Sequence, residues 1–193
     1  MNPFLRALPH LITLFRLFSA PVIVWLLVER KYPEALLWTV LAGISDWFDG
    51  YTARKLKLAG QLGVVLDPFA DKVLLVVLFI ALGVLGMIPL WMLALAIGRD
   101  LVIVIGAALV RIFRGVHKFM PTTLGKVSTF FQIMLVLLAL SYAAWPVDIV
   151  HWLKLTALVL SAFFTFASGA DYVRIGIGMA RRRPEQVTSE PET

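Results

Sequence analysis

Apolar residues run along most of this 193-residue chain in blocks long enough to cross a lipid bilayer as helices. Windows of about 20 mainly apolar residues identify six candidate helices. They cover residues 11–28, 35–47, 63–85, 90–112, 127–145 and 149–172. The second block is short, but it reaches about 20 residues if its helix continues through Thr52 and carries polar groups into the bilayer. The pattern therefore predicts an all-α, polytopic membrane protein with six transmembrane helices.

Prolines and cations in the connections predict how these helices are oriented. Pro33, Pro89 and Pro146 fall in or near three connections, where a helix can begin or end at little cost. Lysines and arginines gather in the other connections and in the tail, and they mark the cytoplasmic side. These cations are Arg54, Lys55, Lys57, Arg111, Arg114, Lys118, Arg181, Arg182 and Arg183. We therefore expect an integral protein of the cell inner membrane with both termini in the cytoplasm.

Composition excludes several classes of protein. Apolar residues make up 60% of the chain and charged residues 16%, which is far from the balance of a soluble globular domain. The net charge is +6, but the cations sit in short stretches rather than along one solvated face, so we expect no nucleic-acid partner. The chain has no cysteine, which excludes disulfides, a thiolate nucleophile and a cysteine metal site. We expect one membrane domain over residues 1–180 and a polar, disordered cytoplasmic tail over 181–193.

Four aspartates lie where the second and third predicted helices approach the cytoplasm. Asp46 and Asp49 are three residues apart and Asp67 and Asp71 are four apart, so each pair shares one helix face. If the two helices are neighbours, four carboxylates converge and must be protonated, paired with cations or bound to metal. An all-oxygen set with no histidine or cysteine nearby suits hard ions. The cluster therefore predicts a Mg²⁺ site that could also take Mn²⁺.

Other interpretations of the cluster stay open at this point. The aspartates could pair with Arg54, Lys55 and Lys57 at the membrane surface. A membrane cation transporter also uses intramembrane carboxylates, although it predicts sites near the midplane of the bilayer. A structural membrane subunit would use them only to pair helices, which leaves the nearby glycines unexplained. Gly50 and Gly63 leave room beside the metals for a phosphate-rich ligand.

The spacing of these residues forms a pattern of eight positions over residues 46–71. Its members are Asp46, Asp49, Gly50, Ala53, Arg54, Gly63, Asp67 and Asp71. This pattern resembles, without departure, the signature of the CDP-alcohol phosphotransferases. The six predicted helices agree with that family, and the resemblance extends along most of the chain.

The resemblance implies an activity and roles for the signature residues. Asp46, Asp49 and Asp67 would bind a two-metal centre, and Asp71 would be both a metal ligand and the general base. The reaction would transfer a phosphatidyl group from CDP-diacylglycerol to an alcohol or phospholipid acceptor, with release of CMP. The enzyme would be a homodimer in membrane lipid with a cytoplasmic active site. The CDP group would be held by Asp46, Gly50, Ala53, Arg54 and Gly63.

Weaker motifs of the same resemblance predict the acceptor site. Leu11, Thr13 and Arg16 match the family's entry to the first helix, and Arg99-Asp100 and Gly125-Lys126 with Thr129 and Gln132 match positions around the acceptor pocket. The subfamilies concerned are the phosphatidylglycerophosphate synthases and the eukaryotic-type cardiolipin synthases. Arg99 and Lys126, with Arg111 and Arg114 near the mouth of the cavity, favour glycerol 3-phosphate as acceptor. Arg16, which would lie near the metal-bound phosphates, is assigned to the same acceptor site. The Arg99-Asp100 pair favours the alternative, cardiolipin synthesis from phosphatidylglycerol. Arg99 could instead form an ion pair with Asp100 or Asp171.

Overall fold

All described residues of the chain are helical or lie in short turns between helices. The computed structural model describes residue 15 and residues 18–56, 63–114 and 122–181. Inside those helices, the description excludes the side chains of residues 46–56, 63–71, 107–114, 177 and 179–181. Since no strand occurs within the described ranges, the all-α prediction is confirmed.

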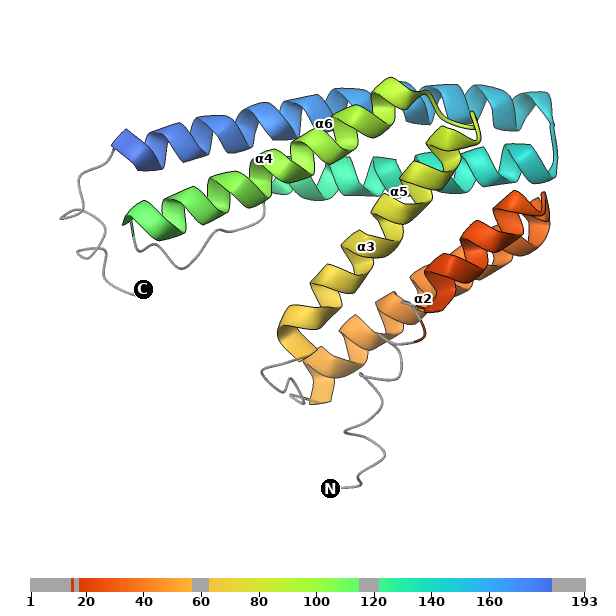
Figure 1. Cartoon of the computed structure of the whole chain (residues 1–193), viewed down its shortest axis with the longest axis horizontal. Helices are drawn as coiled ribbons and strands as arrows, with labels where there is room; N and C mark the ends of the chain where they lie inside the picture. Colours follow the sequence, from red (N-terminus) through yellow and green to blue (C-terminus); the bar gives the residue numbers. More distant parts are fainter. Residues whose placement is uncertain (1–14, 16–17, 57–62, 115–121, 182–193) are drawn as a thin grey trace. The chain divides into compact units, whose positions relative to one another are not determined.

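A helical segment, Phe18–Val28, precedes five longer helices (Figure 1). Four of them have ends within a few residues of the predicted ones, and α6 continues well past residue 172. The predicted continuation of the second helix through Thr52 is confirmed. The bounds are α2 Tyr32–Leu56, α3 Gly63–Val84, α4 Leu90–Arg114, α5 Thr123–Ala144 and α6 Asp148–Arg181.

Within the described residues, two helices are long and apolar enough to cross a membrane. They are Thr123–Ala144, which is α5, and Asp148–Gly176, which is most of α6. Phe18–Val28 and Lys72–Val84 are apolar but shorter in their described parts. The arrangement of six membrane-spanning helices stays a prediction.

The turns after Phe18–Val28 and after α3 close with the same set of backbone hydrogen bonds. Lys31 N donates to Leu26 O at 2.9 Å, and Met87 N donates to Leu82 O at 2.9 Å. Each bond spans six residues, and each turn has one residue with positive φ, Arg30 at 58° and Gly86 at 73°. This is the Schellman motif, which satisfies the last carbonyls of a helix and stops it sharply.

The chain divides into two compact units, and α5 and α6 contribute a part to each. Unit 1 is Met1–Leu90 with Ile133–Leu155, and its described core is apolar, with fully buried side chains such as Ile23 and Leu82. The buried hydroxyls of this unit, Ser19 and Thr39, donate only to the carbonyl four residues earlier in their own helix.

Unit 2, which is Trp91–Gln132 with Thr156–Thr193, has a different core. Six of the eight buried polar side chains found in the described part of the protein belong to it. They come from all three of its helices, and all of them except Ser161 form a hydrogen bond with a neighbouring helix. These residues are Arg99, Ser128, Gln132, Ser161, Thr165 and Ser168. Polar contacts therefore supply much of the packing in unit 2, as they do between helices in membranes.

Candidate functional site

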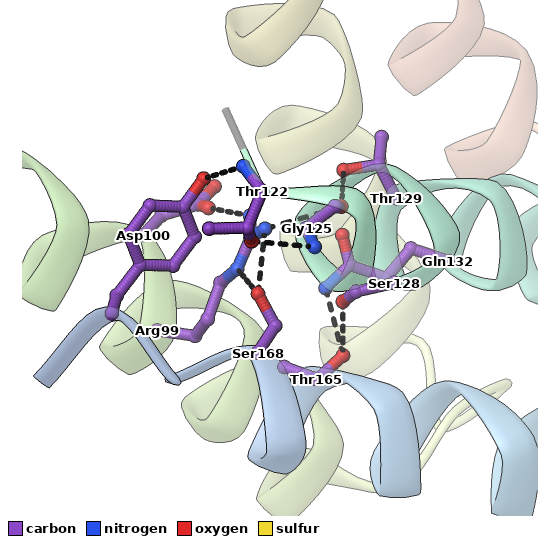
Figure 2. A network of polar contacts seen from close by, with 10 residues as sticks. Arg99, Asp100, Thr122, Gly125, Ser128, Thr129, Gln132, Thr165 and Ser168 are labelled. Carbon is purple, nitrogen blue, oxygen red and sulfur yellow. Dashed lines mark hydrogen bonds and ion pairs between the residues drawn. The ribbon is translucent and has the colours of Figure 1, made fainter. Parts of the chain in front are cut away.

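Arg99 lies at the centre of a polar cluster in unit 2, formed by α4, α5 and α6 (Figure 2). Its side chain comes from the middle of α4, and the residue is 7% exposed. Arg99 Nε and Nη2 both donate to Ser168 Oγ on α6, at 3.3 and 3.1 Å. Nη2 also donates to Gly125 O on α5 at 3.2 Å, and Nη1 is paired with Asp100 Oδ1 at 2.7 Å. The guanidinium therefore links all three helices of the unit.

The first turn of α5 is held by a cap and by a side chain from α6. Thr122 precedes the helix, and its hydroxyl accepts the N–H of Gly125 at 3.1 Å, as an N-cap residue does. The N–H of Thr122 donates to Tyr172 Oη on α6 at 3.0 Å. The Tyr172 ring centre lies 5.9 Å from the guanidinium carbon of Arg99, within the range of a cation–π contact. Contacts from α4 and α6 thus meet at one turn of α5.

A second group of polar side chains lies further along α5 and α6 (Figure 2). The hydroxyls of Ser128 and Thr165 lie 3.0 Å apart, and Gln132 Nε2 donates to Thr165 Oγ1 at 3.1 Å. Beside them, the rings of Phe131 and Phe164 stack with centroids 5.0 Å apart. Buried groups of this kind are costly when unpaired, so their mutual bonds favour one register of α5 against α6.

Side chains of other residues crowd the position where a Cβ of Gly125 would lie. A Cβ built on it would lie 3.0 Å from Arg99 Nη2 and 3.1 Å from Tyr172 Oη. Both distances are tighter than ordinary van der Waals contact, so a side chain here would displace the guanidinium or the phenol. Glycine is therefore the residue that lets the guanidinium of Arg99 reach the backbone of α5.

The structure brings two of the three predicted acceptor residues to the same turn of α5. Arg99 contacts Gly125, and the next residue, Lys126, is exposed in the first turn of the helix. Thr129 donates from its hydroxyl to the same carbonyl, Gly125 O, at 3.1 Å. Arg16 lies outside the described residues. Of the two carboxylates expected as ion-pair partners of Arg99, Asp100 is the one that forms the pair.

The aspartate signature falls on two consecutive helices of unit 1. Asp46 and Asp49 are in the second half of α2, and Asp67 and Asp71 are in the first turns of α3. Gly50, Ala53 and Arg54 share α2, and Gly63 is the first residue of α3. The side chains of all these residues lie outside the described part of the structure, so their convergence on a metal stays a prediction.

The polar residues that α6 contributes to the cluster were not identified from the sequence, although their spacing indicates them. Ser161, Thr165, Ser168 and Tyr172 recur every three or four residues, which places them on one face of a helix. All four are buried in unit 2, at 6% exposure or less. A polar stripe on an otherwise apolar helix indicates a contact with other polar residues in the protein interior.

These observations can be compared with known proteins. A family model described as CDP-alcohol phosphatidyltransferase matches residues 6–167, which is most of the sequence. The chain belongs to the CDP-alcohol phosphatidyltransferase family. The match includes the whole signature on α2 and α3 and all three predicted acceptor residues.

The relatives of this chain carry names of two activities. The chain is 30% identical over 178 residues to the CDP-diacylglycerol--glycerol-3-phosphate 3-phosphatidyltransferase of Aquifex aeolicus, covering 89% of this chain and 96% of that protein. It is 36% identical over 150 residues to a chloroplastic enzyme of the same name from Oryza sativa, covering 69% and 46%. It is 35% identical over 180 residues to a cardiolipin synthase (CMP-forming) and mitochondrial hydrolase fusion protein of Schizosaccharomyces pombe, covering 86% and 30%. The chain thus spans less than half the length of the rice and fission yeast relatives.

Membership has consequences for substrates and cofactors. Substrates of CDP-alcohol phosphatidyltransferases are CDP-diacylglycerol and alcohol or lipid acceptors, and the family generally uses divalent metals. Its members with these names are membrane-associated enzymes of phospholipid biosynthesis. The family identified from the signature is therefore confirmed, and the roles of individual residues follow as proposals.

Proposed function

We propose that this protein transfers the phosphatidyl group of CDP-diacylglycerol to glycerol 3-phosphate, with Mg²⁺, to give phosphatidylglycerophosphate and CMP. The observation that carries the proposal is the complete aspartate signature on the consecutive helices α2 and α3. The relative from A. aeolicus is named for this reaction and is matched over nearly its whole length, which supports the choice of acceptor.

The proposed metal site takes its ligands from two helix faces. Asp46 and Asp49 are three residues apart on α2, and Asp67 and Asp71 are four apart on α3, so each pair shares one face in helical register. The donor set consists of carboxylate oxygens, which fits Mg²⁺ or Mn²⁺ and disfavours zinc and copper. Bound there, the metal would stabilise negative charge on the phosphoryl oxygens as a Lewis acid.

The chain's own groups then carry out the transfer. Asp71 accepts the proton of the acceptor hydroxyl as general base. The hydroxyl oxygen forms a bond to the phosphorus that carries diacylglycerol, and the bond from that phosphorus to the phosphate oxygen of CMP breaks. Five residues of the signature orient the CDP group during this displacement. They are Asp46, Gly50, Ala53, Arg54 and Gly63.

The acceptor site is proposed to involve Arg16, Arg99 and Lys126. The exposed Lys126 offers an ammonium group to a phosphate, and a doubly charged phosphate such as that of glycerol 3-phosphate gains most from such a contact. The second candidate acceptor is phosphatidylglycerol, which would give cardiolipin. It is favoured by the Arg99-Asp100 dipeptide and by the name of the fission yeast relative.

The proposed setting is a membrane with six spans, both termini and the active site on the cytoplasmic side of the inner membrane, and a homodimeric enzyme. Residues 1–180 form the membrane domain and 181–193 the tail. Large apolar side chains on the outer surface support this setting, because water would disfavour so many of them. On α6 they lie on faces away from the polar stripe. Examples are Val159 at 67% exposure, Phe163 at 64% and Phe166 at 70%.

The test is an assay of purified full-length protein in detergent micelles with CDP-diacylglycerol. Glycerol 3-phosphate, phosphatidylglycerol, serine and inositol phosphate are supplied separately and in competition, and CMP and the lipid product are identified by mass. We expect CMP release with phosphatidylglycerophosphate as main product. Cardiolipin as main product would replace the acceptor assignment, and absence of CMP with every acceptor would overturn the activity and leave the transporter alternative.

A further inference from the structure

The guanidinium of Arg99 is occupied by the protein itself. An arginine side chain has five N–H donors, and the bonds to Ser168, Gly125 and Asp100 engage four of them. A phosphate bound to Arg99 through two N–H groups would have to replace at least one bond that is buried between helices. The geometry thus disfavours Arg99 as a direct ligand of the acceptor.

One contact of Arg99 is instead made to the backbone of Gly125, the residue that precedes the exposed Lys126. Gly125 O accepts from Arg99 Nη2 at 3.2 Å, and Lys126 is the next residue. The same turn is held by the Thr122 cap and by Tyr172 Oη. A lysine side chain is flexible, so the position of its ammonium depends strongly on how well its Cα is fixed. Arg99, Ser168 and Tyr172 supply that fixation from α4 and α6.

We infer that Arg99 is a positioning residue for Lys126, which contacts the phosphate of the acceptor, and that Ser168 on α6 holds Arg99 in place. This inference rests on the proposed function, because it assigns the acceptor contact to Lys126. It also assigns a role to Ser168, which none of the sequence motifs includes. Figure 2 shows the arrangement, with Arg99 directed from α4 toward Ser168 and Gly125.

A double-mutant cycle tests whether Arg99 acts through Lys126. The variants are Arg99→Lys, Lys126→Ala and the double variant, assayed as purified full-length protein with saturating CDP-diacylglycerol and varied glycerol 3-phosphate. Arg99→Lys keeps the charge, but a single ammonium cannot reach three acceptors on three helices. We expect each single variant to raise KM about tenfold, the size of one charge-assisted hydrogen bond, and the double variant to stay within about twofold of Lys126→Ala. If both residues bind the phosphate independently, the two increases multiply to about a hundredfold, and the positioning role is overturned.

Ser168→Ala provides a second cycle that leaves the guanidinium in place. It removes the acceptor of two Arg99 bonds, so we expect KM for glycerol 3-phosphate to rise about fivefold in the presence of Lys126 and not to rise in Lys126→Ala. The matched control is Ser161→Ala, on the same face of α6. Ser161 is fully buried, and its hydroxyl has no hydrogen-bond partner among the described residues, so its removal should leave KM unchanged. A Ser168→Ala variant that behaves like Ser161→Ala overturns the role of Ser168 as the residue that holds Arg99.

Two further measurements distinguish a failure of the proposed function, a failure of the positioning role and a variant that does not fold. A wild-type protein that releases no CMP with any acceptor overturns the proposed function, whereas additive effects in a fully active enzyme overturn only the positioning role. Thermal unfolding in detergent checks that each variant is folded. If Arg99→Lys does not fold, Gly125→Ala replaces it, because a Cβ 3.0 Å from Arg99 Nη2 displaces the guanidinium without deleting a donor or acceptor. Gly125→Ala should then raise KM only when Lys126 is present, and a rise in both backgrounds contradicts the inference.

Discussion

The charge of Arg99 and the charges of the signature aspartates are balanced by different kinds of partner. Arg99 has its carboxylate partner in the next residue, Asp100, and three further bonds to α5 and α6. The two aspartate pairs of the signature are separated by a connection rich in cations, but cations alone would not account for the glycine spacing. A buried or interfacial charge needs a partner, and for carboxylates at these spacings that partner is proposed to be metal.

The first prediction concerns two of these aspartates. Asp67→Asn and Asp71→Asn keep the size of the side chain but remove a charge that binds metal or accepts a proton. We expect each to lower CMP release at least about a hundredfold, since general base catalysis usually contributes that much or more. The matched control is Asp148→Asn, an exposed aspartate in the first turn of α6, which should keep full activity. An Asp71→Asn enzyme with more than about a tenth of wild-type activity would exclude Asp71 as the base.

Metal dependence is the second prediction at this scale. Mg²⁺ or Mn²⁺ should support CMP release, because both accept all-oxygen octahedral sites, and removal by excess chelator should abolish it. Ca²⁺ should bind without supporting turnover, since its coordination is longer and looser. The measurement is the initial rate in chelator with each metal added back. Full turnover in excess chelator contradicts the two-metal proposal.

Helix ends show how local sequence sets the length of an element here. The turns at Arg30 and Gly86 use the same bonds, but only one of them has the residue that the motif favours. A side chain in the left-handed region crowds the following carbonyl, which destabilises that conformation by about 1–2 kcal/mol. Arg30 therefore carries a strain that Gly86 avoids.

This difference gives the third prediction. Gly86→Ala should lower the free energy of unfolding by about 1 kcal/mol, because alanine at φ 73° is strained. Arg30→Gly should raise it by less, because glycine also increases the entropy of the unfolded chain. The control is Gly43→Ala in α2, where an added Cβ meets nothing within 4 Å and alanine favours the helix. Thermal unfolding in detergent measures all three, and the same sign for Gly86→Ala and Gly43→Ala contradicts this account.

The helices could be predicted from the sequence because apolar blocks and prolines mark them directly. Pro89 lies immediately before α4 and Pro146 two residues before α6, and the blocks between such breaks are too long and too apolar to be strands. The extension of α6 to Arg181 was missed, because Arg174 interrupts the apolar run and because Gly176 and Gly178 have a low helix propensity.

The site could be predicted only in part, because some of its interactions join residues that are far apart in the sequence. The aspartate spacing is local, so helix periodicity reveals it. The bond from Arg99 to Ser168 joins residues 69 positions apart, and no local rule specifies which serine of α6 it meets. The dipeptide Arg99-Asp100 did indicate an ion pair, and that pair is present. The contacts of Arg99 and Tyr172 at the first turn of α5 depend on how three helices pack together, and this packing could not be predicted from the sequence alone.

For the whole molecule, tryptophans at the helix ends agree with the orientation predicted from the cations. Four of them are half or more exposed, and all lie beside the connections that carry few cations, at the side predicted to face away from the cytoplasm. They are Trp25 at 55%, Trp91 at 54%, Trp145 at 54% and Trp152 at 66%. Tryptophan favours the level of the lipid headgroups, so the positions of these residues support the proposed orientation.

The fourth prediction tests that orientation directly. The chain contains no cysteine, so single cysteines can be introduced without removing any native residue of that type. Cysteine at Lys57 or at Arg182, positions outside the described residues, should react only with reagents that reach the cytoplasm, and cysteine at the exposed Lys31 only with reagents outside the inner membrane. Labelling is measured in intact cells with a membrane-impermeant maleimide, and lysed cells give the full signal. Because the signature precedes Lys57 on α2 and resumes on α3, labelling of position 57 from outside would place the carboxylates on the leaflet away from cytoplasmic glycerol 3-phosphate, and the proposed reaction could not proceed there.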